Sequence, residues 1–244
     1  MRKADPIDIL QYDHPAVTVD TVLFTIMDED LKVLLVQRRV DPYQDFWSLP
    51  GGFVRMDESL EDGALRKLKE KTNVDDIYLE QLYTFGELGR DPRARVITIA
   101  YYALVSSERF TLIPSEAVSD VNWHSIYALP DLAFDHGRII AYALQRLRNK
   151  LGYTTVGSQL LPEKFTLPEL CRIYEVILNK AIDKRNFRKK VAFLDILEET
   201  DETTQKHSKK PARLYRFKQS DIVDLPQGSR NPIQPKIPRS LKGL

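Results

Sequence analysis

The side chains best suited to chemistry gather between residues 52 and 74. Gly52 is followed after five residues by Glu58, and Glu58 after seven residues by Arg66. Three charged residues then come at spacings of three and four, which places them on one face of a helix: Lys67, Glu70 and Lys71. One carboxylate beside two ammonium groups repels a divalent cation and attracts an anion. The spacing therefore predicts a site for a negatively charged ligand.

This stretch resembles the Nudix box, the signature of a family that cleaves diphosphate compounds. In that family a glycine, five residues, a glutamate, seven residues and an arginine are followed by Glu-aliphatic-x-Glu-Glu-x-Gly-aliphatic. Six positions agree with the pattern: Gly52, Glu58, Arg66, Leu68, Glu70 and Val74. Three positions depart from it. Lys67 and Lys71 stand where the family has metal-binding glutamates, and Asn73 stands where it has glycine.

These departures bear on the metal that the Nudix resemblance implies. Magnesium prefers near-octahedral oxygen ligands, and in the family three glutamates on one helix face supply them. With lysine at positions 67 and 71, the local formal charge changes from −3 to +1, and hydrolysis loses its Lewis acid. We therefore predict a pocket that binds a diphosphate compound without cleaving it, with no metal site and no required cofactor.

Two other interpretations of the box stay open at this stage. A substitute cage would keep the chain a metal-dependent hydrolase, with Glu58, Glu61 and Glu70 as the metal ligands. Alternatively, Lys67 and Lys71 both point to solvent, as lysines on surface helices usually do. The first alternative predicts turnover of a nucleoside diphosphate, and the second predicts no role for the lysines.

A second set of candidates lies in the segment 89–93, which resembles a loop of the Nudix subgroup that acts on ADP-ribose. Arg90, Asp91 and Arg93 are its candidate ligand-binding residues. Arginines on a turn held by proline can bind phosphate oxygens in a bidentate manner. The alternative is an exposed loop whose Arg–Asp pair is merely solvated.

The remaining pocket candidates come from the predicted strands. Arg38 and Arg39 end one strand, whose alternation lets only one of them face the pocket. Trp47 either stacks on a base or packs in the core, and Phe53 belongs to the box itself. Three histidines show neither metal-ligand spacing nor a neighbouring nucleophile, and we expect them to be structural: His14, His124 and His136.

Composition narrows the class of protein. The chain has 244 residues, and its single cysteine, Cys171, excludes an internal disulfide and is expected in the core. No apolar run approaches the roughly 18 residues that span a bilayer, and a secretory signal is missing, so we expect a soluble cytoplasmic protein. Residues 1–150 carry 18 Lys and Arg against 24 Asp and Glu, whereas residues 151–244 carry 18 against 11. This asymmetry predicts two domains, the second with a polyanionic partner.

Patterning in residues 1–152 predicts a mixed sheet with helices on both faces. Alternating, β-branched segments indicate strands at 16–26, 32–38, 46–49 and 95–105. A helix is expected to begin near Ser59, because Ser59 and Asp62 have the spacing of a capping box. A second, amphipathic helix covers 136–151. This is the α/β (α+β) mixed-sheet sandwich that the Nudix resemblance implies.

The rest of the chain follows the plan of a small winged helix-turn-helix domain. Three segments are predicted: a linker at 153–164, the winged domain at 165–225 and a proline-rich, flexible tail at 226–244. Thr166 and Glu169 form a capping box, and Asp183 caps the next helix. The expected elements are helices from Thr166 to about Asn179 and over 184–194, and strands at 195–200 and 211–217 around a basic loop.

The helix at 184–194 has the composition of a helix that reads DNA. A helical projection groups Phe187, Val191 and Leu194 on the core side, and the opposite side is basic. The candidate DNA-binding residues are Lys184, Arg185, Asn186, Arg188 and Lys189 of the helix, and Lys206, Lys209, Lys210, Arg213 and Arg216 of the wing. A basic face that is merely solvated, an RNA and an acidic protein are the alternatives.

The two halves together resemble the Nudix-related transcriptional regulators, the NrtR family. The C-terminal half carries the resemblance at residues 161–170, 174–175, 183–190 and 211–217. The resemblance implies a catalytically degenerate Nudix domain that senses ADP-ribose or a related nucleotide. It also implies a homodimer that binds a palindromic operator in double-stranded DNA, is released by the ligand, and represses genes of NAD metabolism.

The resemblance leaves the ligand and the reaction less certain than the architecture. A related branch of the family responds to arabinose, so a sugar-responsive regulator is one alternative. Some members keep hydrolase activity, which makes a metal-dependent ADP-ribose hydrolase the other. Because Lys67 and Lys71 replace metal ligands, we predict a ligand-responsive DNA-binding regulator rather than an enzyme.

Overall fold

The computed structural model describes residues 13–106, 108, 110–204 and 211–218. Seven strands form one sheet in this part of the chain: β1 (Ala16–Met27), β2 (Asp30–Arg38), β3 (Trp47–Ser48), β4 (Gly51–Phe53), β5 (Glu80–Phe85), β6 (Val96–Leu104) and β7 (Val118–Ser125). The strand order is β3-β2-β1-β6-β5, with β4 paired to β1 and β7 paired to β2. Since β1 runs parallel to β6 and antiparallel to β2, the sheet is mixed, as predicted.

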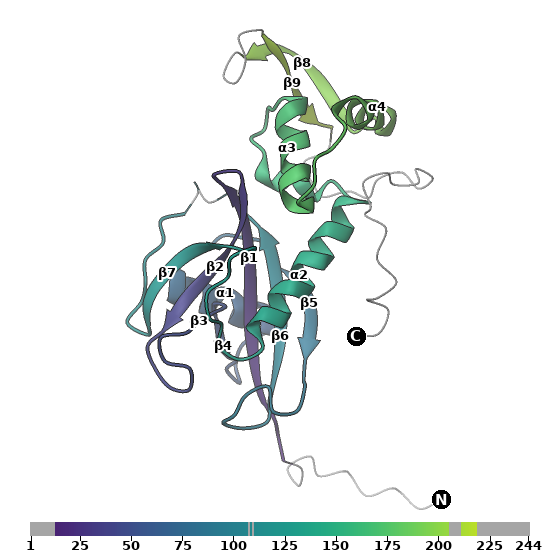
Figure 1. Ribbon diagram of the computed structural model, residues 1–244. Helices are drawn as coiled ribbons and strands as arrows, with labels where there is room; N and C mark the ends of the chain where they lie inside the picture. The colour runs from purple at the N-terminus through teal and green to yellow at the C-terminus, as the bar shows by residue number, and fades with distance from the viewer. Residues whose placement is uncertain (1–12, 107, 109, 205–210, 219–244) are drawn as a thin grey trace, which may run out of the picture.

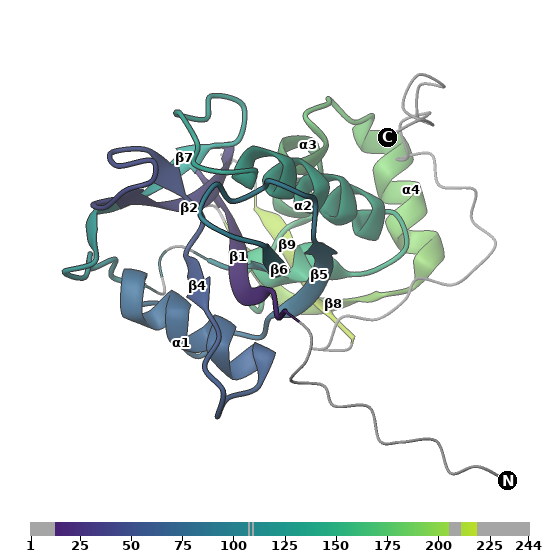
Figure 2. The same cartoon turned by 90° about the horizontal axis from the view of Figure 1, so that it is seen from below.

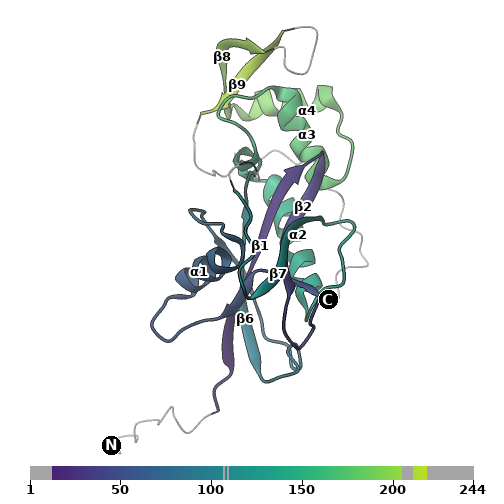
Figure 3. The same cartoon turned by 90° about the vertical axis from the view of Figure 1, so that its left-hand side faces the viewer.

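Strands β1 and β2 form the long hairpin that the sequence predicts. Asp28 and Glu29 at its turn have φ angles of 54° and 60°, a conformation that favours a tight turn matching the twist of the strands. Phe24 pairs with Val33 in the register that follows. The turn end of the hairpin reaches the C-terminal half of the molecule (Figures 1 and 3).

Two helices cover opposite faces of the sheet, α1 (Leu60–Thr72) and α2 (His136–Leu151) (Figure 2). The alternation of β1 decides which side chains meet each helix. Val19 and Leu23 lie in the cluster that contains Leu68 of α1. Val22 and Phe24 lie in the cluster that contains α2 residues such as Ile139. The predicted sandwich with helices on both faces is therefore confirmed.

Local chemistry fixes both ends of α1. Ser59 is the N-cap, and its side-chain oxygen accepts a hydrogen bond from the backbone N–H of Asp62 at 3.1 Å, as the sequence predicts. Asn73 ends the helix in the left-handed conformation, with a φ of 62°. Asparagine tolerates this conformation better than most residues, so the left-handed helix end forms without the glycine of the Nudix box.

The C-terminal half contains the predicted winged helix-turn-helix elements. They are the 3₁₀ helix η3 (Val156–Leu160), α3 (Leu167–Leu178), α4 (Lys184–Leu194), β8 (Leu197–Thr204) and β9 (Ala212–Phe217). The capping box of α3 is complete, since the N–H of Thr166 donates to Glu169 at 2.7 Å and the N–H of Glu169 donates to the hydroxyl of Thr166. Asp183 caps α4 by accepting from the N–H of Asn186 at 2.7 Å.

The segment predicted as a linker is packed. Thr154, Thr155 and Val156 are buried, and the hydroxyl of Thr154 donates to the carbonyl of Lys150 at 2.9 Å. One hydrophobic cluster runs from the sheet through α2 and η3 into α3 and α4. The two halves therefore share a core, and the joint between them is a turn rather than an extended chain.

Two further observations complete the fold. Among the described residues, none of the helices has the length and apolar character needed to cross a bilayer. The predicted tail at 226–244 and the loop that holds Lys206, Lys209 and Lys210 lie outside the described residues.

Candidate functional site

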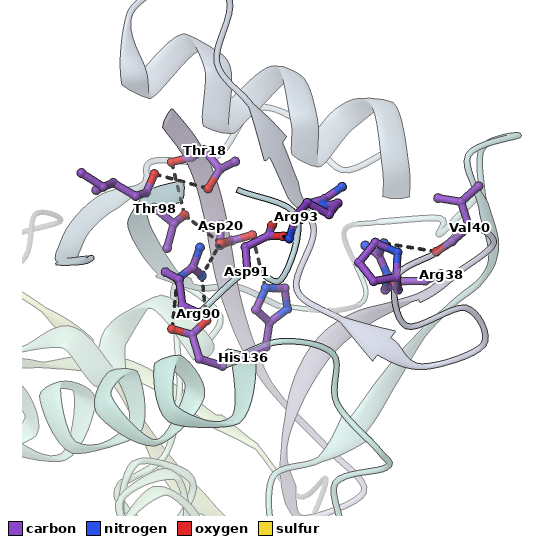
Figure 4. A network of polar contacts seen from close by, with 12 residues as sticks. Thr18, Asp20, Arg38, Val40, Arg90, Asp91, Arg93, Thr98 and His136 are labelled. Carbon is purple, nitrogen blue, oxygen red and sulfur yellow. Dashed lines mark hydrogen bonds and ion pairs between the residues drawn. The ribbon is translucent and has the colours of Figure 1, made fainter. Parts of the chain in front are cut away.

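A cavity of about 250 Å³ lies between β1, β4, α1 and the loop that precedes β6. Seven of the predicted ligand-binding residues line it: Arg38, Phe53, Lys67, Lys71, Arg90, Asp91 and Arg93. They come from segments that are far apart in the sequence, and the mixed sheet brings them to one cavity. Figure 4 shows four of them, Arg38, Arg90, Asp91 and Arg93. The Nudix box thus forms one wall of a pocket, as its resemblance implies.

Two glycines allow the chain to pass close to this pocket. A Cβ atom at Gly51 would lie 2.2 Å from a carboxylate oxygen of Asp20. A Cβ atom at Gly52 would lie 3.0 Å from Cδ of Lys67, and Gly52 has a φ of 155°. Only glycine fits such positions without displacing a neighbour, so this turn lets Lys67 fold over the strand into the cavity.

The two glutamates of the box are held by Arg66 and Lys67. Nε of Arg66 donates to Glu58 at 2.7 Å, Nη1 of Arg66 donates to Glu70 at 3.0 Å, and Nζ of Lys67 donates to Glu70 at 2.9 Å. The hydrogen bond from Arg66, helped by one from a backbone N–H, lowers the pKa of Glu58 to about 2. The structure thus places Glu58 and Glu70 outside the cavity lining, where they orient the basic side chains.

Two other predicted ligand-binding residues also lie outside the cavity. Arg39 points away from it and donates to the backbone carbonyl of Glu116 at 2.9 Å, which agrees with the prediction that only one of the two arginines faces the pocket. Trp47 packs against the core and contacts the ring of His124 edge-on, with centroids 4.1 Å apart. Its ring is used for packing, which is the second of the two roles considered for it.

Most cations of the pocket already have a carboxylate partner. Arg90 donates to Asp135 through two nitrogens at 3.1 and 2.7 Å. Arg93 binds Asp91 in the same bidentate way, at 2.9 and 2.7 Å, and Lys67 is paired with Glu70. Two lining cations make no ion pair with any described residue: Arg38 and Lys71. The pocket therefore contains positive charge that a bound anion can neutralise.

The environment of Lys71 perturbs its ionisation. Burial lowers the pKa of Lys71 to about 8, and the neighbouring cations Lys67 and Arg38 add to this effect, while Asp20 opposes it. Burial also lowers the pKa of Arg38. Ammonium and guanidinium groups held in this way gain more from a bound anion than fully hydrated ones do.

A buried polar cluster in the pocket is absent from the predicted site residues. Asp20 accepts a hydrogen bond from the hydroxyl of Thr98 at 2.7 Å, and His136 Nε2 lies 3.7 Å from its carboxylate. Nδ1 of His136 accepts from the backbone N–H of Leu49 at 2.9 Å, which leaves the proton on Nε2. A carboxylate in the middle of an otherwise apolar strand is the sequence signal for Asp20.

Aromatic rings border the charged part of the pocket. Phe134 has the guanidinium of Arg38 4.9 Å from its ring centroid and that of Arg93 at 5.6 Å. Arg93 also lies 5.7 Å from the centroid of Phe53. Phe134 is a further pocket residue missing from the prediction, and no pattern in the sequence singles it out. The pocket thus offers planar apolar surfaces next to cations.

The second candidate interface is the exposed side of α4. Phe187, Val191 and Leu194 are buried, as predicted. The five predicted DNA-binding residues of the helix are exposed: Lys184, Arg185, Asn186, Arg188 and Lys189. None of its four predicted DNA-binding cations is in an ion pair within the part of the chain that the structure describes. This face therefore carries unneutralised positive charge.

The two described strands of the hairpin beside α4 hold their basic side chains in ion pairs. Arg213 is paired with Glu199, and Arg216 donates to Glu198 at 2.9 Å. Strand β8 also extends to Thr204 and includes two further acidic residues. Both arginines therefore sit in ion pairs on the hairpin, and the two described strands of the wing offer less free positive charge than α4 does.

Comparison with known proteins covers both halves of the chain. Residues 17–143 match the model of the NUDIX domain, and residues 157–217 match that of the NrtR DNA-binding winged helix domain. A protein of Acinetobacter baylyi named ADPR responsive transcriptional repressor NtrR is 40% identical over 214 residues, which are 86% of this chain and 85% of the relative. The chain belongs to the NrtR family.

Solved structures of NrtR resemble this molecule in both of its halves or in the Nudix half alone. Shewanella oneidensis NrtR complexed with a 27mer DNA is 45% identical, with a TM-score of 0.71, over 83% of this chain and 93% of that one. The Nudix domain of the same protein complexed with ADP ribose is also 45% identical, with a TM-score of 0.54, over 58% of this chain and 94% of that one. The predicted order of a Nudix fold and a winged helix is thereby confirmed.

Proposed function

We propose that this protein is a transcriptional repressor that binds ADP-ribose, or a closely related nucleotide, in its Nudix domain. Its winged helix binds a palindromic operator as a homodimer, and the ligand releases the DNA. The observation that carries this proposal is the pair of uncompensated cations, Arg38 and Lys71, in a Nudix pocket fused to a winged helix. The Acinetobacter relative named as ADPR responsive and the Shewanella complexes support it.

The chemistry of the pocket favours a diphosphate over a neutral ligand. Arg38 and Lys71 lack carboxylate partners among the described residues, and Lys67 lies beside them. A diphosphate supplies the charge that offsets their burial, whereas a pentose such as arabinose supplies none. The rings of Phe53 and Phe134 provide surfaces on which a nucleobase stacks. We therefore assign the diphosphate to the cations and the base to the aromatic border.

Magnesium fits this site poorly. Two of the three positions that hold the ion in Nudix hydrolases carry lysine, and the third, Glu70, is bound to Arg66 and Lys67. Glu58 of the substitute cage is likewise held by Arg66. A dication at this place would meet two ammonium groups at close range. These contacts support a pocket that holds the ligand without hydrolysing it.

A metal-dependent hydrolase is the second candidate. It is favoured by the NUDIX match and by the retained Gly52, Glu58, Arg66 and Glu70. It requires the ion pairs of Arg66 and Lys67 to open so that their carboxylates can bind the metal. The arrangement of charges makes this candidate weaker than ligand sensing.

The remaining parts of the proposal follow from the family. Regulation of NAD metabolism, a palindromic operator and a homodimer are what membership in the NrtR family implies. A regulator of this kind meets its operator in the cytoplasm. A ligand releases DNA only if it binds the DNA-free conformation more tightly than the DNA-bound one.

Binding of ADP-ribose to the purified full chain tests the pocket directly. Calorimetry in EDTA should give the same affinity as in Mg²⁺, and chromatography should recover the ligand intact. Lys71→Met should weaken binding at least tenfold, because a charge-assisted contact contributes roughly 1.5–3 kcal/mol. Lys69→Met is the matched control, since Lys69 lies on the same helix, is exposed and pairs with Asp75.

Two results would overturn the assignment. Loss of binding in EDTA would mean that a metal ion holds the ligand. Hydrolysis of ADP-ribose in Mg²⁺ or Mn²⁺ that disappears in Glu70→Gln would show a working Nudix enzyme.

A further inference from the structure

One residue on the basic face of α4 differs in kind from its neighbours. Phe193 is 77% exposed, and its ring contacts no other aromatic ring within the described part of the chain. The core side of the helix is already filled by Phe187, Val191 and Leu194. Phe193 is therefore not needed for packing, and it exposes a large apolar side chain on the same side of the helix as Lys189.

The position of Phe193 on the helix is defined by helical geometry. Asn186, Lys189 and Phe193 follow at spacings of three, four and seven residues, which place them along one side of the helix. Asn186 and Lys189 are exposed along the same stripe. An 11-residue helix is about 16 Å long at 1.5 Å per residue, so Phe193 stays within reach of a groove that Asn186 and Lys189 occupy.

The positive charge of α4 indicates which class of partner covers Phe193. Lys184, Arg185, Arg188 and Lys189 make no ion pair with the described residues, and such a face complements a polyanion rather than an apolar protein surface. The floor of the DNA major groove presents one strongly apolar group, the C5-methyl of thymine. A phenylalanine in a basic helix face matches that group.

We propose that Phe193 reads the C5-methyl group of a thymine in each half of the operator. This inference rests on the proposed function, in which α4 lies in the major groove. In this arrangement the arginines contact guanine or phosphate, the lysines contact phosphate, and Phe193 supplies an apolar contact that distinguishes thymine from the other bases. Phe193 is then a specificity-determining residue at the C-terminal end of the recognition helix.

Replacing thymine by deoxyuridine tests the contact without changing base pairing. The operator is first selected from random duplexes with the full chain, and each thymine is then replaced singly. For the native protein, each half-site should contain one thymine whose replacement, made singly, weakens binding about fourfold, as expected for the loss of one methyl contact. For Phe193→Ala, the same replacement should change the affinity less than twofold, while Phe193→Leu should keep most of the discrimination.

Two controls accompany this titration. Tyr78→Ala removes an aromatic ring of similar exposure, 74%, from the Nudix domain, and its profile should equal that of the native protein. Thermal unfolding of Phe193→Ala should match that of the native chain, because the ring is exposed.

Three outcomes would overturn the inference. In the first, no replacement of a thymine changes the affinity of the native protein. In the second, Phe193→Ala responds to each replacement as the native protein does. In the third, Phe193→Ala lowers the mass of the particle in solution, which would show that a second copy covers the ring. Arg188→Ala distinguishes a failure of the Phe193 inference from a failure of the assignment of α4 as the recognition helix. If Arg188→Ala also leaves operator affinity unchanged, α4 is not the recognition helix and that part of the proposed function fails with the inference.

Discussion

Lys71 is the residue whose ionisation reports what the pocket holds. Burial, with the adjacent cations Lys67 and Arg38, lowers its pKa to about 8. The ammonium group is thus partly deprotonated in the empty pocket at mildly alkaline pH. An anionic ligand reverses the balance because its charge favours the protonated form. Ligand binding and proton binding at Lys71 are therefore coupled.

This coupling predicts proton uptake when ADP-ribose binds. At pH 8 about half of the free protein lacks the Lys71 proton, so binding should take up close to half a proton, and almost none at pH 6. The affinity should fall as the pH rises from 7 to 9. Calorimetry in two buffers with different ionisation enthalpies measures the uptake. Equal apparent enthalpies at pH 8, or an uptake that persists in Lys71→Met, would contradict the assignment.

Lys71 should also make the ligand-free protein less stable than a variant with an uncharged side chain at this position. Its pKa is below the roughly 10.4 of an unfolded lysine, so the cost of burying its charge is fully present below about pH 8 and disappears as the pH approaches 10.4. Lys71→Met should therefore raise the free energy of unfolding at pH 7 and lose most of this advantage by pH 10. Urea denaturation at the two pH values measures both. A variant less stable than the native chain at pH 7 would show that Lys71 has a compensating contact.

At the scale of elements, the β1–β2 hairpin connects the ligand pocket with the DNA-binding half. Asp20 and Arg38 lie in the pocket at one end of these strands. At the other end Glu29 binds Arg172 of α3 at 2.9 Å. Nearby, Arg148 of α2 donates to the carbonyl of Ile177 at 2.9 Å. We propose that a movement of the hairpin or of α2 on ligand binding reaches α3 through these polar contacts and through the hydrophobic core that the two halves share.

Breaking these contacts should reduce the response to the ligand more than either binding event. In Arg148→Ala, operator affinity and ADP-ribose affinity should each change less than threefold. The factor by which ADP-ribose lowers operator affinity should fall several-fold. Arg172→Glu should have a smaller effect because its partner is exposed, and adding Glu29→Arg should restore the response. Fluorescence anisotropy of a labelled operator measures all variants. An undiminished shift in Arg148→Ala would exclude this route.

Some of these elements are predictable from the sequence because their signals are local. The bounds of α4 follow from the Asp183 cap and the spacing of its buried residues. Strands β5 and β7 have no counterpart in the prediction, since β7 is mostly polar and β5 lies at the edge of the sheet. The segment around Val156 has the composition of a linker, yet tertiary packing against α3 folds it into η3.

The pocket is also predictable only in part, because local spacing reveals some of its residues and tertiary packing brings in the others. The box gives Lys67 and Lys71 because helical spacing places them together. Asp20, His136 and Phe134 come from distant segments, and only the packing of β1 against α2 and its preceding loop brings them to one cavity. Strand alternation predicts that one of Arg38 and Arg39 turns away from the pocket, but only the contacts in the structure show that it is Arg39 and that Trp47 packs in the core.

At the scale of the whole molecule, the structure contains two separate basic sites. One is the pocket within the acidic Nudix half, and the other is the exposed face of α4 in the basic half of the chain. A homodimer places two α4 helices on one operator, which is how palindromic sites are read. The particle in solution should then have twice the chain mass of 28.2 kDa.

The salt dependence of operator binding should show how many protomers bind one operator. Lys189→Ala removes one phosphate contact per protomer, so the slope of log K against log salt should become less negative by about 2 for a dimer, at roughly 0.9 per phosphate. A monomer would give about 1. Lys69→Ala, a change of the same charge in the Nudix half, should leave the slope unchanged, and an unchanged slope in Lys189→Ala would remove this residue from the interface.

The central claim, that a pocket built to cleave a diphosphate now holds one to control DNA binding, is tested most directly by one titration. The labelled operator is bound to the full chain in EDTA, and ADP-ribose is added. We expect the native protein to release the operator and Lys71→Met to release it only at ligand concentrations at least tenfold higher. An operator that stays bound at saturating ADP-ribose, or a release that needs Mg²⁺ and consumes the ligand, would contradict the account.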